Sequence, residues 1–157
     1  MSTTTVNHQR PDTPAGQAAP PTLAITVEID PLRVRHGHRI DSSYVETFWL
    51  SHLGPSSVCV LRTIARMTEP GGTVTVPYPA LAEAIGLGTS AAKHAPLGRT
   101  LDRLVRFGAA RWTATDRSRI TIWSHLAPVA PRLRQHWPDW LQAAHDSLDP
   151  NAEAGDR

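Results

Sequence analysis

The sequence contains one cysteine and no long apolar run, and both absences exclude whole classes of protein. Cys59 cannot form an internal disulfide, and its place in the apolar run VCVL predicts a buried thiol. No apolar stretch approaches the ~18 residues that a membrane-spanning helix needs. The opening residues, MSTTTVNHQRPDTP, lack the apolar centre of a secretory signal peptide. We therefore expect a cytoplasmic protein with no membrane partner.

The motifs of common catalytic and metal sites are also missing. The sequence has no GxSxG and no HExxH, and GLGTS (86–90) lacks both the preceding parallel strand and the lysine of a phosphate-binding loop. His36 and His38 could in principle join His52 or His125 around a metal, but they have no cysteine or acidic partner nearby. We expect no enzyme activity, no cofactor and no metal.

Acidic residues are scarce in the middle of the chain, where arginine is abundant. Residues 55–137 hold eleven Lys/Arg and four Asp/Glu, a net charge of +7, whereas the whole chain carries only +2. A basic block of this kind indicates a polyanionic partner, nucleic acid first. The alternative is a solvated arginine-rich surface that binds nothing.

The chain divides into one domain between two tails. Residues 1–22 and 149–157 lack hydrophobic periodicity and predict disorder, which leaves a domain over 23–148. Within it, LAITVEI (23–29) predicts an edge strand. The apolar spacing then predicts helices over 41–53 and 55–67, a strand over 73–76 and a short helix from about Pro79. Two short helices, PRLRQHW and PDWLQAAHDSL, are expected at the end.

The segment near 94–107 predicts a strongly two-sided helix. At about 100° per residue, Leu97, Leu101 and Leu104 fall on one side. The arginines at 99, 103 and 106 cluster nearly opposite. Pro96 suits the first helical position and Gly108 the end. Two strands over 109–113 and 119–123, joined by ATDRS, follow as a hairpin.

A short helix, a turn, a basic helix and a hairpin form the layout of a winged helix-turn-helix. We expect a mainly α fold with a small β-hairpin (α+β) and extra helices at both ends. The segment PYPALAEAIGLGTSAAKHAPLGRTLDRLVRFGAARW resembles the winged helix-turn-helix domains of bacterial transcription regulators. With the flanking helices, residues 40–148 look like a little-characterised actinobacterial group of such proteins. The resemblance implies the fold and DNA binding, and it assigns no residue a role.

We therefore predict a sequence-specific binder of double-stranded DNA, used in transcription regulation. Its basic helix would enter the major groove, because the guanidinium fork matches guanine or phosphate. The hairpin would lie along the backbone or minor groove. The predicted DNA-binding residues are Lys93, His94, Arg99, Thr100, Arg103, Arg106, Arg117 and Arg119.

Two other functions remain open. A winged helix also serves as a protein-interaction module, and a plasmid or phage replication or partition factor would bind DNA with the same residues. The last helix carries an apolar stripe that either covers its own domain or pairs with a second copy in a homodimer. That stripe consists of Trp140, Leu141, Ala144 and Leu148.

Overall fold

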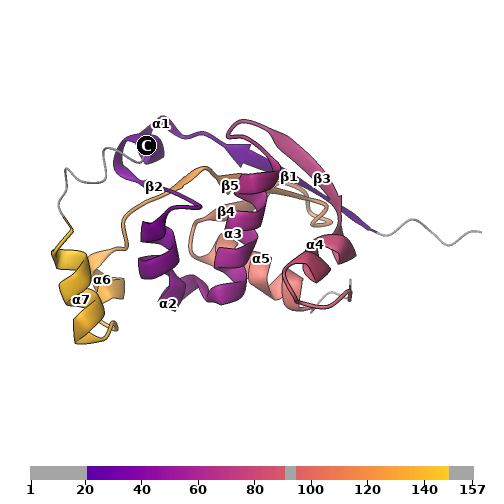
Figure 1. Cartoon of the computed structure of the whole chain (residues 1–157). Helices are drawn as coiled ribbons and strands as arrows, with labels where there is room; N and C mark the ends of the chain where they lie inside the picture. Colours follow the sequence, from indigo (N-terminus) through magenta and orange to yellow (C-terminus); the bar gives the residue numbers. More distant parts are fainter. Residues whose placement is uncertain (1–20, 91–94, 149–157) are drawn as a thin grey trace, which may run out of the picture.

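The structure is a computed structural model that describes residues 21–90 and 95–148. It combines helices with one small sheet and a separate two-stranded ribbon. Helices lie against one side of the sheet, and the last two helices sit at one end of the molecule (Figure 1). No helix in the described part of the chain is long and apolar enough to cross a membrane.

The main sheet has four strands in the order β3-β1-β5-β4. β1 (Thr22–Glu28) pairs antiparallel with β3 (Thr73–Pro77) and parallel with β5 (Arg119–Trp123). β4 (Ala110–Trp112) forms the hairpin with β5. The strand expected over 23–29 is therefore present, but it lies in the interior of the sheet. Its prediction as an edge strand was wrong, and the sheet is larger than a lone hairpin.

Three helices bury their apolar faces against this sheet. They are α3 (Pro55–Met67), α4 (Tyr78–Ala84) and α5 (Pro96–Arg106), which lie below the strands in Figure 1. Leu97, Leu101 and Leu104 of α5 are completely buried, as their spacing predicts. Full burial of a leucine side chain contributes roughly 1.5–3 kcal/mol. The leucine side thus fixes the orientation of α5, and its arginines are carried to the opposite side.

The helix expected over 41–53 contains a π-helical turn, Val45–Trp49 (η1), which runs into α2 (Leu50–Leu53). The Ser42 hydroxyl accepts a hydrogen bond from the Val45 amide at 3.4 Å, near the start of this segment. Gly54 ends the segment at φ 76° and leads directly into α3. A left-handed φ of this kind favours glycine.

Three short elements of the domain are not defined by the sequence pattern. α1 (Pro31–His36) follows β1, and β2 (His38–Arg39) pairs with β6 (His125–Leu126). At the other end, α6 (Pro131–Arg134) and α7 (Asp139–Asp146) pack beside α2. Trp137, between them, is buried, and its indole N–H donates to the Ser51 hydroxyl at 2.9 Å.

The prediction of a buried thiol at Cys59 was wrong. Cys59 is exposed, although its neighbours Val58 and Val60 are buried. The buried side of α3 is centred on Ser57, Leu61 and Ile64. Cys59 falls nearly opposite that centre at 100° per residue, so the apolar run VCVL does not occupy a single face.

Candidate nucleic-acid interface

α5 presents its predicted arginines to solvent. Pro96 is its first residue, and Gly108, at φ 72°, follows its end. Arg99, Arg103 and Arg106 are all exposed, and none has a carboxylate within ion-pair distance in the described part of the chain. Lys93 and His94, predicted to bind DNA, lie outside the described residues.

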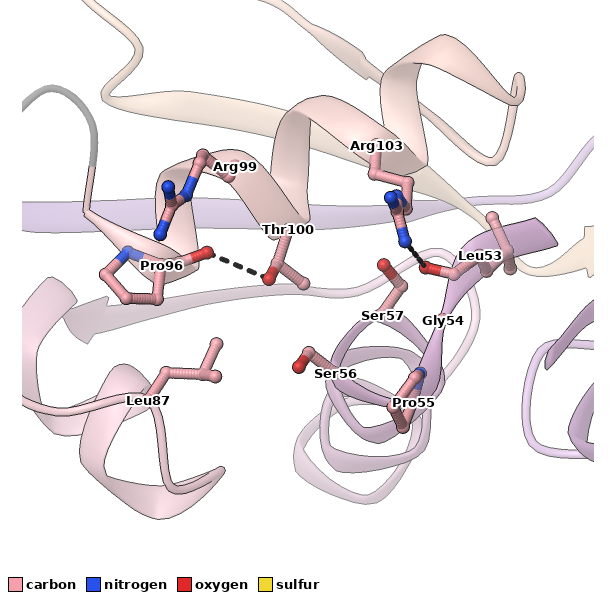
Figure 2. A pocket seen from close by; sticks show the side chains of 10 residues that line it. All are labelled: Leu53, Gly54, Pro55, Ser56, Ser57, Leu87, Pro96, Arg99, Thr100 and Arg103. Atoms are coloured by element: carbon pink, nitrogen blue, oxygen red, sulfur yellow. Dashed lines mark hydrogen bonds between the residues drawn. The ribbon is translucent and has the colours of Figure 1, made fainter. Parts of the chain in front are cut away.

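Thr100 lies on the inner side of α5 and not among its arginines. Its side chain is buried, and its hydroxyl donates to the Pro96 carbonyl oxygen at 2.9 Å (Figure 2). The cause is angular, because Thr100 precedes Leu101 and falls only about 40° from Leu104. The structure therefore gives Thr100 a position beside the helix α3 and away from the outermost surface of α5.

The tip of the β4–β5 hairpin is tied to α5. Arg117 and Asp102 form an ion pair, and the Trp112 indole N–H donates to the same carboxylate oxygen at 3.1 Å. The Arg117 guanidinium also lies over the Trp112 ring, 4.9 Å from its centre. Arg117 is thus held by a carboxylate, whereas the sequence predicts an arginine available for the DNA backbone.

The turn itself is built around Asp116. The Ser118 hydroxyl and amide donate to this carboxylate at 2.6 and 3.0 Å, and these bonds hold the pKa of Asp116 below its usual value. Arg117 takes φ 62° and is the one non-glycine residue with positive φ in the described ranges. Arg119 begins β5 and is exposed, in agreement with its predicted place at the start of the returning strand.

Arginines farther along the sheet are used to pack other elements. Arg111 pairs with Glu28 at 2.7 Å, and both Arg111 and Arg33 lie over the Trp123 ring, at 5.1 and 4.6 Å from its centre. Trp112 and Trp123 are half-buried at the sheet. This part of the basic block is internally compensated.

A pocket of about 310 Å³ lies between α5 and the start of α3 (Figure 2). Arg99 and Arg103 extend over it from α5, and the first turn of α3 forms the opposite wall. Arg103 Nη1 makes a long hydrogen bond, 3.5 Å, to the Leu53 carbonyl oxygen. The described lining residues are Leu53, Gly54, Pro55, Ser56, Ser57, Leu87, Pro96, Arg99, Thr100 and Arg103, which include no Asp or Glu.

Sequence reasoning missed the α3 side of this pocket. Residues 53–57 lie about forty positions before α5, and only the packing of α3 on α5 brings them to its arginines. The local signal was GPSS, a glycine and proline that start a helix, followed by two small hydroxyl residues. That pattern marks a helix N-terminus and carries no information about what faces it.

The C-terminal stripe divides between the core and solvent. Leu141 is buried and Ala144 half-buried against the domain, whereas Trp140 is 68% exposed and Leu148 37%. The inner half of the stripe covers its own domain, one of the two expected roles. Among the described residues, no group of histidine, cysteine and acidic side chains could hold a metal ion.

Comparison of the chain with protein-family models, with curated proteins and with solved structures finds no match. The argument for function therefore depends on the residues and contacts described above.

Proposed function

We propose that this protein is a winged helix-turn-helix protein that binds double-stranded DNA, with α5 as its recognition helix and the β4–β5 hairpin as its wing. The order of α4, a turn, α5 and the hairpin supports this fold. DNA-binding proteins of the helix-turn-helix type place the second helix of the motif in the major groove.

One observation carries the proposal: the three arginines on the outer side of α5 are exposed and have no carboxylate partner among the described residues. Elsewhere in the basic block, Arg62, Arg111 and Arg117 are paired with Glu46, Glu28 and Asp102. An arginine without a carboxylate partner keeps its charge uncompensated and most of its donors available for phosphate or guanine. Such arginines gather on the side of α5 that faces away from the core.

Binding to duplex DNA tests the proposal directly. Fluorescence anisotropy with a labelled duplex of mixed sequence, followed by selection from a random duplex pool, measures affinity and sequence preference together. Arg99→Gln and Arg106→Gln are each expected to weaken binding and to reduce the salt dependence. Arg66→Gln is the matched control, because Arg66 is also exposed but lies near the far end of α3.

Sequence specificity and a role in transcription regulation extend this proposal. Arg99, in the first turn of α5, would read a base, and its replacement should cost about 1–3 kcal/mol at one base position. Equal affinity of Arg99→Gln, Arg106→Gln and the parent protein for every duplex at low salt would contradict the proposal that α5 binds DNA. An enriched site from the selection would then be tested for occupancy in the genome by immunoprecipitation.

A protein-interaction module is the second candidate, and the exposure of Trp140 favours it. A tryptophan 68% exposed on α7 offers a large apolar surface of the kind enriched at protein interfaces. Sedimentation of the parent and of Trp140→Ser distinguishes a homodimer, the expected partner for this stripe, from a monomer. Loss of self-association in Trp140→Ser, with no DNA binding by the parent, would favour this candidate over the first.

A further inference from the structure

The pocket between α5 and α3 contains hydrogen-bond donors from both helices. Arg99 and Arg103 approach from α5, and both are exposed on its outer surface. The first turn of α3 supplies backbone amides, since the amides of the first helical residues have no acceptor within the helix. α3 has 13 residues, and Gly54 before it offers no side-chain cap. The amides of Ser56 and Ser57 therefore have neither an acceptor within the helix nor a side-chain cap.

Ser57 gives an independent indication of a ligand. It is only 1% exposed, its hydroxyl has no hydrogen-bond partner among the described residues, and it lines the pocket. Figure 2 shows this hydroxyl directed into the space between α3 and α5. This hydroxyl is not among the fully buried polar atoms that lack a partner in the described chain, so it stays accessible from the pocket and can bond to a ligand there.

The charge of the pocket defines the chemistry of the ligand. Two guanidinium groups and the positive end of the α3 dipole meet there, and none of the described lining residues is acidic. The carbonyl oxygens of Leu53 and Pro96 are already engaged, by Arg103 and Thr100. Free hydrogen-bond donors therefore outnumber free acceptors in the pocket, and this excess favours an anion with several oxygen atoms.

We propose that this pocket binds a phosphate group through the Ser56 and Ser57 amides, the Ser57 hydroxyl and the guanidinium groups of Arg99 and Arg103. The phosphate group belongs either to the backbone of a duplex or to a small phosphorylated molecule. The inference does not depend on DNA binding, because its evidence comes from the pocket alone.

Titration of the full chain with inorganic phosphate tests this proposal, with sodium chloride at matched ionic strength as the reference. The largest phosphate-specific shifts in an amide NMR spectrum are expected at Ser56 and Ser57. Arg103→Gln should weaken phosphate binding by at least about tenfold, and Ser57→Ala by roughly fivefold. Arg66→Gln removes the same charge from α3 outside the pocket and should bind as the parent does.

Addition of an unlabelled duplex identifies the source of the phosphate group. A higher apparent Kd for phosphate in its presence assigns the pocket to the DNA backbone, and an unchanged Kd assigns it to a small phosphorylated molecule. The proposal is overturned if phosphate shifts Ser56 and Ser57 no more than chloride does, or if Arg66→Gln weakens binding as much as Arg103→Gln. The titration of the parent decides the question even where a variant does not fold. Failure of duplex binding alone leaves the phosphate titration unaffected, so the two proposals fail separately.

Discussion

Asp102 of α5 accepts hydrogen bonds on one carboxylate oxygen from both Arg117 and Trp112 of the β4–β5 hairpin. This single carboxylate joins the two elements that the proposed DNA interface comprises. It also neutralises a guanidinium at the hairpin tip. The same contact that orders the hairpin therefore reduces the positive charge available to a polyanion.

Asp102→Asn is expected to increase affinity for duplex DNA. The amide can still accept from Trp112, but it no longer holds the charge of Arg117, which becomes available to a phosphate. One additional phosphate contact should steepen the slope of log K against log salt by about 0.9. Glu83→Gln, an equal charge change at an exposed position of α4, is the control. A similar gain in both variants would assign the effect to net charge alone.

The backbone at Arg117 should show a preference for glycine once the guanidinium is removed. Arg117→Gly and Arg117→Ala both lose the ion pair, but only alanine must keep a side chain at φ 62°. We expect the glycine variant to have the larger free energy of unfolding, by about 1 kcal/mol. Urea denaturation of the two variants measures this difference. Greater stability of the alanine variant would contradict the left-handed conformation of this turn.

Leu101 should be among the least tolerant positions of α5. Its side chain is fully buried, so Leu101→Ala leaves a cavity and should lower the free energy of unfolding by about 2–5 kcal/mol. Arg106→Ala, on the exposed side, should change it by no more than about 0.5 kcal/mol. Equal effects in urea denaturation would show that α5 does not pack through its leucines.

Acidification should destabilise the fold through histidines. Burial lowers the pKa of His145 below 6.5, and the charge of Arg134 lowers it further. Burial likewise lowers the pKa of His52 and His125. Below about pH 6.5 the unfolded chain thus binds more protons than the folded chain, so the free energy of unfolding falls as pH falls. Denaturant midpoints at about pH 7.5 and 5.5 measure this loss.

His145→Gln provides the control for that dependence. Glutamine does not titrate, but it can still bond to the Tyr44 hydroxyl, which His145 contacts at 2.9 Å. The variant should lose less stability between the two pH values than the parent does. An equal or greater loss would show that protonation of His145 does not oppose folding.

The main helices could be predicted from the sequence, whereas the place of β1 could not. Pro96, Gly108 and the leucine spacing define α5 locally, because each acts through its own turn of helix. In β1, Leu23, Ile25 and Val27 alternate with residues that are half-buried between neighbouring strands. Alternation identifies a strand, but an interior strand of a sheet covered on one face shows the same alternation as an edge strand.

The arginines of the candidate interface could be predicted on the same basis, and their partners could not. The helical period separates Arg99, Arg103 and Arg106 from the leucines, and the structure keeps them exposed. The pairing of Arg117 with Asp102 depends on how the hairpin folds over α5, which no local pattern encodes. The same holds for Ser57, whose hydroxyl faces a helix that begins at Pro96, about forty positions later in the sequence.

The interior position of β1 has a consequence for how the chain reaches its native state. Ala24 pairs with Arg119, 95 positions later, so the middle of the sheet is completed by one of the most distant pairings in the domain. Contacts of such separation close slowly, because the intervening chain must be ordered first. During synthesis on a ribosome, β3 emerges before β5. β1 can then pair with β3 while its other edge is still unpaired. We therefore expect the helical layer to assemble early and the pairing of β5 with β1 to complete the sheet.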